Sequence, residues 1–445
     1  MTIEPMKRSR TEWKLPTFLA FYDTGSTSPT EIARAARGLV RPVFVFGESA
    51  HAFHMGKVVH SLGLETVTQR ELSGRRWLED AAVQGVLSFS DHTLEQAAEF
   101  AARAGVHCVA PEAVSALINK VHQRSRLSCT QQPVQSLPLG SLDSVSGVVR
   151  CVGLPAVIKP DVGAGSSLVS VATSEAEVRA GAMRIWASGH TPLLEELLEG
   201  DHDRLPCGDY VSVETLSVAG THRPFAISQK SPLVRPFRET SHIWAPERGI
   251  DSVAVEQICM EALSALGYSY GLSHTEIKLT PTGPRVIEVN ARVGGFINDF
   301  AQAVAGVDLI REYILSLLDD TGQRVQRQTF SDYNIAFRTI CPVVEGEFVS
   351  VTGHSAARRV PGVRRVRPVM SSGTPVVGDG SSQELDLLIV SADSQEGLFT
   401  ALTDALSQLD YHFVLRTGTM LKYSALELPS RDALPAGLLT RRGTA

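Results

Sequence analysis

Residues Thr275–Gly295 form the stretch that most constrains how this chain can fold. Its turn signal is Pro281–Pro284, which separates two runs of strand-forming residues. Side chains two apart on a strand leave the same face, so Glu288 and Asn290 share a face, and Glu276 can lie opposite them across the turn. The sequence therefore predicts a β-hairpin that gathers two carboxylates and an amide oxygen on one patch.

These three side chains are the hard oxygen ligands that Mg²⁺ takes while it keeps waters and substrate phosphates as its other ligands. The alternative is a hairpin with a solvated polar face. The apolar neighbours Val286, Ile287 and Val289 argue against that alternative, because burying a carboxylate without a partner is costly. We therefore expect a site for Mg²⁺ or Mn²⁺ with these ligands: Glu276, Glu288 and Asn290.

The residues after the hairpin extend the candidate site. Arg292 continues the alternation and would bring a fixed positive charge beside the metal. Gly294 and Gly295 would let the backbone approach a ligand closely.

Composition and charge exclude several classes of protein. The chain has 445 residues, 43% hydrophobic and 20% charged, with a formal charge of −6, so we expect a globular protein of two to four domains with no general affinity for nucleic acid. The arginine clusters Arg358–Arg359 and Arg364–Arg367 are interpreted as a solvated rim rather than a DNA-binding face. Six scattered cysteines without a CxxC pair, no apolar N-terminal segment and no long apolar run predict a cytoplasmic protein outside the membrane. The sequence leaves open whether the protein forms a homodimer.

The first part of the chain alternates strand-like and helix-like segments from Pro16 to Leu117, which predicts a parallel sheet with right-handed crossovers. It has no GxGxxG, so a dinucleotide site is not expected there. Thr17–Tyr22 is a predicted strand, and predicted helices cover Pro29–Gly38, capped by Ser28, and Thr93–Ala104, capped by Asp91. Beyond these we expect a helix over Pro111–Val121 that ends near Asn119-Lys120, and a polar linker or loop over Thr130–Val145.

A second phosphate-binding pattern follows the linker. Lys159 ends a predicted strand, and the Gly163–Ser167 turn then joins it to another strand. Backbone N–H groups and hydroxyls in such a turn suit a triphosphate, with a plain tight turn as the alternative. The GxxxxGK[ST] spacing of a P-loop is absent. Leu193–Leu198 is a predicted buried strand rich in glutamate, Asp201–Gly208 an irregular insertion, and the part after Tyr333 an α+β segment.

The order of these features resembles the ATP-grasp superfamily, the fold of biotin carboxylase and D-alanine–D-alanine ligase. The likeness rests on Lys120, Lys159, the Gly/Ser turn, the glutamate-rich strand and the Glu276…Glu288-x-Asn290-x-Arg292 pattern, and it covers roughly Pro16 to Leu318. Arg238–Pro246 (RETSHIWAP) is similar to the E-T-G-H-x-x-P loop of the amino-acid ligases that make dipeptides, with Ser241 in place of the usual Gly.

This resemblance implies an α/β and α+β fold in several parts. We expect a Rossmann-like pre-ATP-grasp domain (1–120), a central lid lobe (121–220), a C-terminal ATP-grasp lobe with the metal site (221–330), an α+β extension (331–428) and a frayed tail (429–445).

The resemblance also implies roles for individual residues. Lys120 and Lys159 would contact the phosphates of ATP, and the turn would cover them. The remaining ATP contacts would be Gly165, Ser166, Ser167, the backbone from Glu195 through Glu196 to Leu198 for adenine, and either Glu199 or Asp209 for ribose. Arg292 and Lys159 would be catalytic, and the amino-acid substrates would lie against Glu239, His242, Trp244, Arg292, Gly294 and Gly295.

Several of these residues have a second interpretation. Glu239 could hold a substrate amino group or pair with Arg235 or Arg238 at the surface. His242 could bind a substrate carboxylate or cap its loop, and Trp244 could be a pocket wall or a packing anchor. Two further histidines are interpreted as structural: His222 and His274.

The implied reaction is an ATP-dependent ligation of a carboxylate to an amine through an acyl phosphate, with amino acids or peptides as substrates and ADP and phosphate as products. Such a transfer needs charge neutralisation and alignment rather than a covalent nucleophile, and the chain has no G-x-S-x-G elbow. The alternatives are a ligase that joins an unusual amino acid to a peptide in natural-product assembly, a biotin-carboxylase-like enzyme, and a nucleotide-binding regulatory module without turnover.

Overall fold

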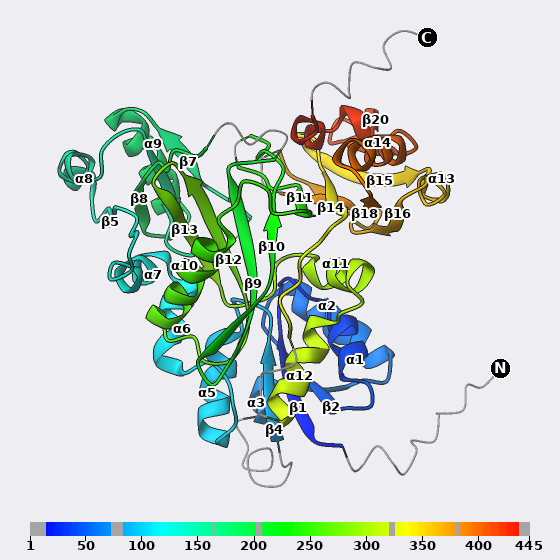
Figure 1. Ribbon diagram of the computed structural model, residues 1–445, viewed down its shortest axis with the longest axis horizontal. Coiled ribbons are helices and arrows are strands. Elements are labelled where there is room, and N and C mark those ends of the chain that lie inside the picture. Colours follow the sequence, from blue (N-terminus) through cyan, green and yellow to red (C-terminus); the bar gives the residue numbers. More distant parts are fainter. Residues whose placement is uncertain are drawn as a thin grey trace.

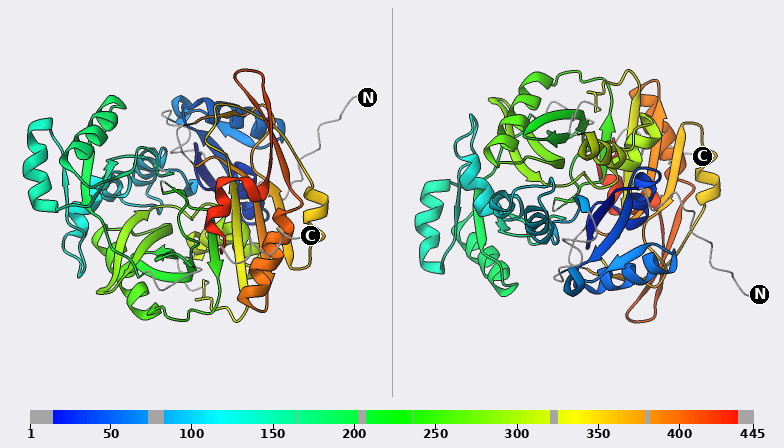
Figure 2. Two further views of the ribbon diagram at one scale, coloured as in Figure 1. Left: turned by 90° about the horizontal axis from the view of Figure 1, so that it is seen from above. Right: turned by 90° about the horizontal axis from the view of Figure 1, so that it is seen from below.

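The computed structural model describes residues 15–72, 83–163, 165–201, 207–235, 237–319, 325–378 and 382–435. Within them the strands form four sheets, one of eight strands and three of four. Figure 1 shows the large sheet in the middle, with the N-terminal part below it, a small lobe at its upper left and the C-terminal part at its upper right. The views along the other axis show the small lobe standing apart from the rest (Figure 2).

The N-terminal part is the parallel sheet that the sequence predicts. Its strand order is β3-β2-β1-β4, and every described pairing is parallel. The strands are β1 (Thr17–Tyr22), β2 (Arg41–Phe46), β3 (Glu65–Val67) and β4 (Val83–Ser88). The helices are α1 (Pro29–Ala36), α2 (Ala50–Ser61), α3 (Gln69–Leu72), α5 (Leu94–Ala104) and α6 (Pro111–Ile118).

Some of the helices in and after this part begin at a residue whose side chain caps the first turn, and others begin without such a cap. Ser28 caps α1 through a capping box with Glu31, as predicted. Asp91 does not cap α5, which starts after Thr93 without a side-chain cap. The helix predicted to end near Asn119-Lys120 is α6, which ends at Ile118. The sequence did not predict the next helix, α7 (Lys120–Leu127), which Asn119 caps from an extended conformation.

The small lobe, which we call the lid, is a four-stranded sheet in the order β5-β8-β6-β7. It contains β5 (Ser136–Pro138), η2 (Leu142–Ser144), α8 (Val145–Val152), β6 (Ala156–Pro160), β7 (Ser170–Ala172), α9 (Glu175–Ala187) and β8 (Pro192–Glu196). The interpretation of Thr130–Val145 as a linker is therefore wrong in part, because β5 pairs with β8 and holds the edge of this sheet.

The eight-stranded sheet has the order β13-β12-β9-β10-β11-β14-β18-β16. Its strands are β9 (Tyr210–Val218), β10 (Thr221–Gln229), β11 (Ser241–Trp244), β12 (Gly271–Thr280), β13 (Gly283–Asn290), β14 (Tyr333–Ile340), β16 (Val363–Pro368) and β18 (Glu384–Ala392). Helices α10 (Ser252–Ala265), α11 (Ile297–Val304) and α12 (Leu309–Asp319) accompany it. The sheet crosses two of the predicted boundaries, since β9 belongs to it and β14, β16 and β18 lie beyond residue 330.

A second small sheet completes the C-terminal part in the order β17-β15-β19-β20. The elements are β15 (Gly346–Thr352), α13 (His354–Ala357), β17 (Pro375–Val376), α14 (Gln395–Leu406), β19 (Asp410–Leu415), β20 (Met420–Ser424), η4 (Ala425–Glu427) and η5 (Pro429–Ala433). The predicted frayed tail is wrong at its start, because Ala433 and Leu434 are buried in the C-terminal core. Its last ten residues lie outside the described part of the chain, as do residues 202–206 of the predicted insertion.

No helix in the described ranges combines the length and apolar character that crossing a membrane requires.

Candidate active site

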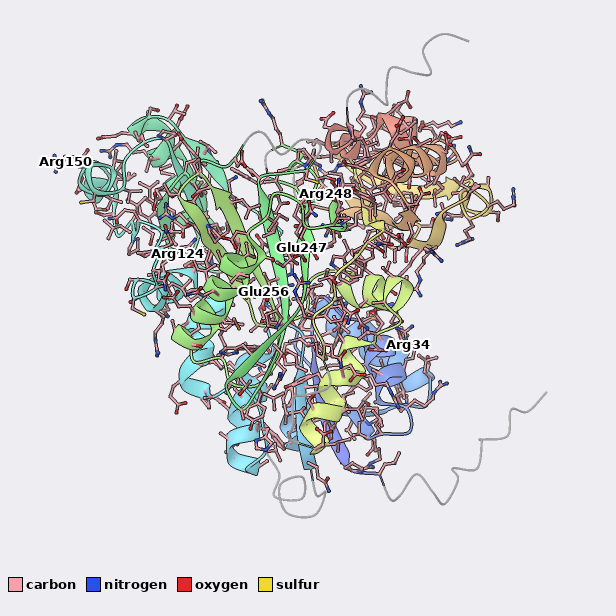
Figure 3. All side chains as sticks on the ribbon, viewed as in Figure 1. Arg34, Arg124, Arg150, Glu247, Arg248 and Glu256 are labelled. Atoms are coloured by element: carbon pink, nitrogen blue, oxygen red, sulfur yellow. The ribbon has the colours of Figure 1, made fainter. Side chains whose placement is uncertain are left out.

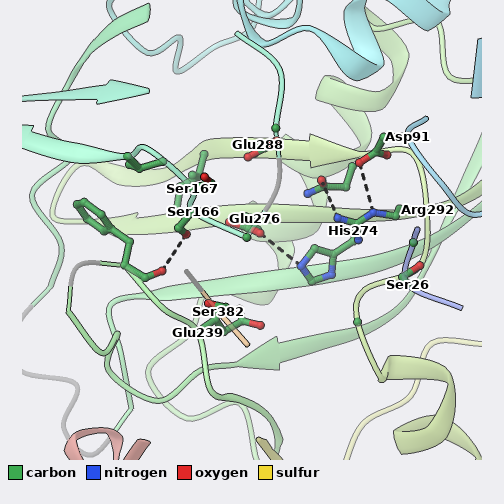
Figure 4. Close-up of a pocket in the computed structure, with 18 of the residues that line it drawn as sticks. Ser26, Asp91, Ser166, Ser167, Glu239, His274, Glu276, Glu288, Arg292 and Ser382 are labelled. Carbon is green, nitrogen blue, oxygen red and sulfur yellow. Dashed lines mark hydrogen bonds and ion pairs between the residues drawn. The ribbon is translucent and has the colours of Figure 1, made fainter. Parts of the chain in front are cut away.

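One cavity of about 730 Å³ lies where all four parts of the chain meet. The N-terminal part contributes the loop Thr24–Ser28, and the lid contributes Lys159 and its Gly/Ser turn. The hairpin contributes Glu276, Glu288, Asn290 and Arg292, and the C-terminal part contributes Arg338, Arg367 and Glu384. Figure 4 shows the hairpin residues between Ser166 and Ser167 on one side of the view and Ser26 on the other.

The hairpin has the predicted geometry. Strands β12 and β13 pair antiparallel, with Glu276 opposite Glu288 and His274 opposite Asn290. Directly opposite residues on a strand pair have their side chains on the same face. The two carboxylates and the amide of the predicted metal site therefore face the same cavity.

Lys120 is the cation closest to the hairpin carboxylates. Its ammonium nitrogen lies 3.0 Å from Glu288 Oε1 and donates to the Gly163 carbonyl oxygen at 2.7 Å. Burial alone would lower the pKa of Lys120, but Glu288, with Asp91 and Glu195 further away, outweighs burial and the pKa is raised. The same contact holds the pKa of Glu288 below its usual value despite burial. Lys120 thus links Glu288, one of the predicted metal ligands, to the Gly/Ser turn.

Lys159 belongs to a second, fully buried charge cluster. Glu195 accepts from Lys159 at 2.8 Å and from Arg124 Nε at 2.6 Å. Arg124, which Figure 3 labels beside α7, also donates to the carbonyls of Val286 and Ile287 on β13. It therefore connects the lid strand that carries Glu195 to the hairpin. Although burial favours the neutral acid, the two cations lower the pKa of Glu195 to about 2. Burial lowers the pKa of Lys159 in spite of the carboxylate.

This cluster makes a stability prediction for Glu195→Gln. The folded pKa of about 2 lies below the ordinary value of 4.5, so ionised Glu195 stabilises the fold above pH 4.5. The shift corresponds to roughly 3 kcal/mol. Urea unfolding at pH 7 should show this difference between wild type and variant, and the difference should shrink as the pH falls from 4.5 towards 2. Glu196→Gln is the matched control: Glu196 is 28% exposed and pairs with Arg285, and its loss should cost under ~1 kcal/mol. A pH-independent difference would contradict the assignment.

The Gly/Ser turn joins β6 to β7, which pair antiparallel, as predicted for a turn between strands. Gly165 has φ 66° and Ser166 φ 58°. A non-glycine residue in this region costs energy and marks a position that its surroundings hold in place. Ser166 Oγ donates to the Phe237 carbonyl at 2.9 Å, so this turn is fastened to the loop that carries Glu239.

Glu239 lies in the cavity wall, among buried cations. Its carboxylate accepts from Lys230 at 2.7 Å and from Arg338 at 2.5 Å, and not from Arg235 or Arg238. His242 lies behind it, 1% exposed, with Nδ1 2.8 Å from Lys230 Nζ. Burial and the Lys230 charge lower the pKa of His242 well below its ordinary value, so the ring is neutral and accepts from Lys230.

Most of the predicted site residues line the cavity. These are Lys120, Lys159, Gly165, Ser166, Ser167, Glu195, Glu196, Leu198, Glu239, Glu276, Glu288, Asn290, Arg292 and Gly295.

Five of the predicted site residues do not line the cavity. For two of them, the contacts that they make elsewhere give the reason. Asp209 pairs with Lys278 at 2.7 Å, and Gly294 N–H donates to Glu214 at 3.1 Å. The five are Glu199, Asp209, His242, Trp244 and Gly294.

Trp244 is a packing residue, and its prediction as a pocket wall is wrong. The side chain is fully buried, stacks on Phe300 at 4.1 Å and on Phe330 at 5.0 Å, and donates to Ser228. Trp244→Ala should therefore destabilise the fold by about 3–5 kcal/mol, measured by urea unfolding. Trp244→Phe keeps an aromatic ring in the stack and should keep both fold and substrate preference. A stable Trp244→Ala protein with altered substrate preference would restore the pocket-wall role.

Several cavity residues escaped the sequence analysis. His274 was interpreted as structural, yet it lines the cavity, with Nδ1 2.5 Å from Glu214. Arg338 is a charged residue inside the apolar strand β14, a pattern that could have signalled a buried site. Arg367 falls in the cluster interpreted as a solvated rim, and this is also wrong, since it lines the cavity.

The donor set suits a hard divalent cation. Across the described ranges, no three His, Cys, Asp or Glu side chains gather closely enough to bind a metal by themselves. The hairpin instead offers two facing carboxylates and an amide oxygen, with room in the cavity for further oxygen ligands. That combination fits Mg²⁺, which takes part of its shell from water and phosphate.

No family model matches the chain. It is 27% identical over 316 residues to the uncharacterized protein y4rH of Sinorhizobium fredii, a match covering 68% of this chain and 62% of that protein. It is 27% identical over 260 residues to mouse carnosine synthase 1, covering 51% of this chain and 30% of the synthase. The matched part thus spans under two thirds of these relatives' lengths.

Among solved structures, the chain is similar to an L-amino acid ligase from Bacillus licheniformis. The TM-score is 0.70 at 19% sequence identity, and the match covers 90% of this chain and 99% of the ligase. At a sequence identity this low, the agreement in shape shows that the two proteins share a fold. The match covers nearly the whole of both molecules, and the protein has the ATP-grasp fold that the sequence predicts.

Proposed function

We propose that this protein is an ATP-dependent carboxylate–amine ligase that forms an amide bond, with a peptide bond between amino acids as the proposed product, and releases ADP and phosphate. The observation that carries the proposal is the single cavity in which two lysines, the Gly/Ser turn and the Glu276–Glu288–Asn290–Arg292 set converge. The likeness to a carnosine synthase and to an L-amino acid ligase supports the same class of reaction.

In the proposed reaction, bound ATP and Mg²⁺ or Mn²⁺ supply a transferable phosphoryl group and charge neutralisation. Lys120 and Lys159 bind the phosphates, and the Gly/Ser turn covers them and excludes water. Glu276, Glu288 and Asn290 hold the metal, and Arg292 orients the acid. Lys159 is suited to binding a phosphate because its partner Glu195 also pairs with Arg124. When Lys159 turns to a phosphate, Arg124 still neutralises the Glu195 carboxylate.

The proposed reaction has two steps. A carboxylate oxygen of the acid attacks the γ-phosphorus, and the bond to the bridging oxygen breaks, giving an acyl phosphate and ADP. The amine nitrogen then attacks the acyl carbon, phosphate leaves with the bonding pair, and the amine loses a proton to solvent. Arg292 and the lysines stabilise the negative charge that develops in both steps.

The test is a screen of acid–amine pairs. The twenty standard L-amino acids and β-alanine are offered pairwise with ATP and Mg²⁺, phosphate release is measured, and products are identified by mass spectrometry. The expected result is ADP, phosphate and an amide product only when acid and amine are both present. AMP and pyrophosphate would contradict the proposal, since they mean adenylation. The proposal places this reaction in the cytoplasm and needs no nucleic acid or membrane.

A further inference from the structure

His274 lies in a row of polar side chains that crosses the large sheet. Glu214 of β9 and Asn290 of β13 are directly opposite it on the two neighbouring strands. Glu276 comes two residues after His274 on β12, so the two side chains leave the same face of the sheet. The register of these strands therefore places His274 beside two of the proposed metal ligands, Glu276 and Asn290.

Glu214 holds the His274 ring in one orientation. The Glu214 side chain is 3% exposed, and its Oε1 lies 2.5 Å from His274 Nδ1. Its Oε2 accepts from the Gly294 N–H at 3.1 Å. An ionised carboxylate can only accept hydrogen bonds, so His274 Nδ1 carries a proton and donates it to Glu214. With Nδ1 engaged in this way, the other ring nitrogen faces the cavity.

That second nitrogen faces Glu276. Nε2 of His274 lies 3.7 Å from Glu276 Oε1, and Figure 4 shows the ring turned toward this carboxylate. Within the part of the chain that the structure describes, no lysine or arginine lies at ion-pair distance from Glu276, whose side chain is 30% exposed. Glu288 instead has Lys120 at 3.0 Å. The two proposed carboxylate ligands therefore have different neighbours, a lysine for one and this imidazole for the other.

Gly294 is a glycine because the chain passes directly over the His274 ring. A Cβ atom at this position would lie 2.5 Å from His274 Nδ1 and 2.9 Å from both His274 Cε1 and Ile297 Cγ1. Packed side chains cannot approach so closely, so any larger residue here would displace the ring or its neighbour. The close backbone approach that the sequence predicts at Gly294 is thus made to His274.

We propose that His274 is a positioning residue, which holds the Glu276 carboxylate in the orientation that the metal requires. Glu214 and the Gly294 backbone hold His274 in turn. The inference rests on the proposed function, because it concerns the metal of that same site. A partly exposed glutamate loses rotamer freedom when a ligand orders it, and a neighbour that has already fixed the carboxylate reduces this loss. Residues that orient metal ligands in this way typically contribute about 10- to 100-fold to metal affinity or activity.

The experiment measures binding of Mn²⁺ by electron paramagnetic resonance in the presence of the non-hydrolysable ATP analogue AMP-PNP, so it does not depend on turnover. The asparagine in His274→Asn places its amide near the position of Nδ1, where it can still donate to Glu214, and has no group that reaches Glu276. This variant should raise the Kd for Mn²⁺ by about 10- to 100-fold. The amide in His274→Gln lies nearer the position of Nε2, and the Kd should stay within about threefold of wild type.

Two further variants separate positioning from a general loss of structure. Gly294→Ala removes no polar group, but its methyl group presses on the His274 ring, so the Kd for Mn²⁺ should rise here too. His222→Asn is the matched control, since His222 is held by the hydroxyls of Ser217 and Ser264 outside the cavity lining. It should bind Mn²⁺ as wild type does. Urea unfolding establishes that each variant compared is folded.

The outcomes separate this inference from the function on which it rests. A wild-type Kd in folded His274→Asn or Gly294→Ala overturns the positioning role and leaves the ligase proposal intact. A loss in His274→Gln as large as in His274→Asn also overturns it, because the contact with Glu276 would then not matter. Equal losses in His222→Asn and His274→Asn overturn it as well. Wild type that binds no Mn²⁺ with AMP-PNP overturns the metal site of the proposed function itself. If His274→Gln does not fold, Gly294→Ala still decides.

Discussion

Glu288→Gln should lower kcat by at least ~1,000-fold, about 4 kcal/mol of lost transition-state stabilisation. The substitution keeps the shape of the side chain and removes its charge, so the hairpin loses one of the two carboxylates that we propose as metal ligands, and Lys120 loses its partner at 3.0 Å. ADP formation with an active substrate pair measures the effect, and the Mg²⁺ concentration for half-maximal rate should rise in parallel.

Glu347→Gln provides the control, since Glu347 is an exposed glutamate on a strand of the small C-terminal sheet. It should behave as wild type. If Glu288→Gln keeps normal turnover and normal Mg²⁺ dependence, the metal assignment falls, and the ligase proposal loses its central residue.

Lys159→Met should weaken ATP binding by about 100-fold, or roughly 2.7 kcal/mol. The methionine fills a similar volume without the ammonium group. Because Arg124 still makes two contacts with Glu195, at 2.6 and 3.0 Å, the buried carboxylate stays paired and the lid keeps its fold. Isothermal titration calorimetry with ATP and Mg²⁺ in the absence of other substrates isolates this step from catalysis.

The matched control is Lys422→Met, which removes an exposed lysine from its pair with Asp410 on the small C-terminal sheet. Its ATP affinity should be that of wild type. Normal affinity in Lys159→Met would refute the phosphate role of this lysine, whatever the variant's turnover.

The sequence was most informative where a local rule decides the outcome. Alternation along β13 and a Pro-Thr-Gly-Pro turn sufficed to place Glu276, Glu288 and Asn290 on one cavity face, because side-chain period and turn position fix which residues meet. The parallel N-terminal sheet followed in the same way from the alternation of strands and helices.

Local rules of this kind do not predict contacts between segments that are far apart in the sequence. Arg124 reaches Glu195 across 71 residues and β13 across 162, and nothing in the sequence of α7 marks one of its basic residues as buried. Trp244 stood in a loop-like motif but pairs into β11, where Phe300 and Phe330 enclose it. Arg367 looked like part of a charged surface because its buried partner, Asp299, comes from a helix 68 residues earlier.

The eight-stranded sheet separates two walls of the cavity that could change independently of each other. Its β13 edge carries the proposed activation chemistry, its β16 edge carries Arg367, and the four Cα pairs between β11 and β14 join the two halves. Exchanging everything from β14 onward for the equivalent segment of a related chain would replace the cavity wall that carries Arg338, Arg367 and Glu384, and would leave the hairpin in place. A new set of side chains on that wall would then require recombination at one position, not the rebuilding of the hairpin.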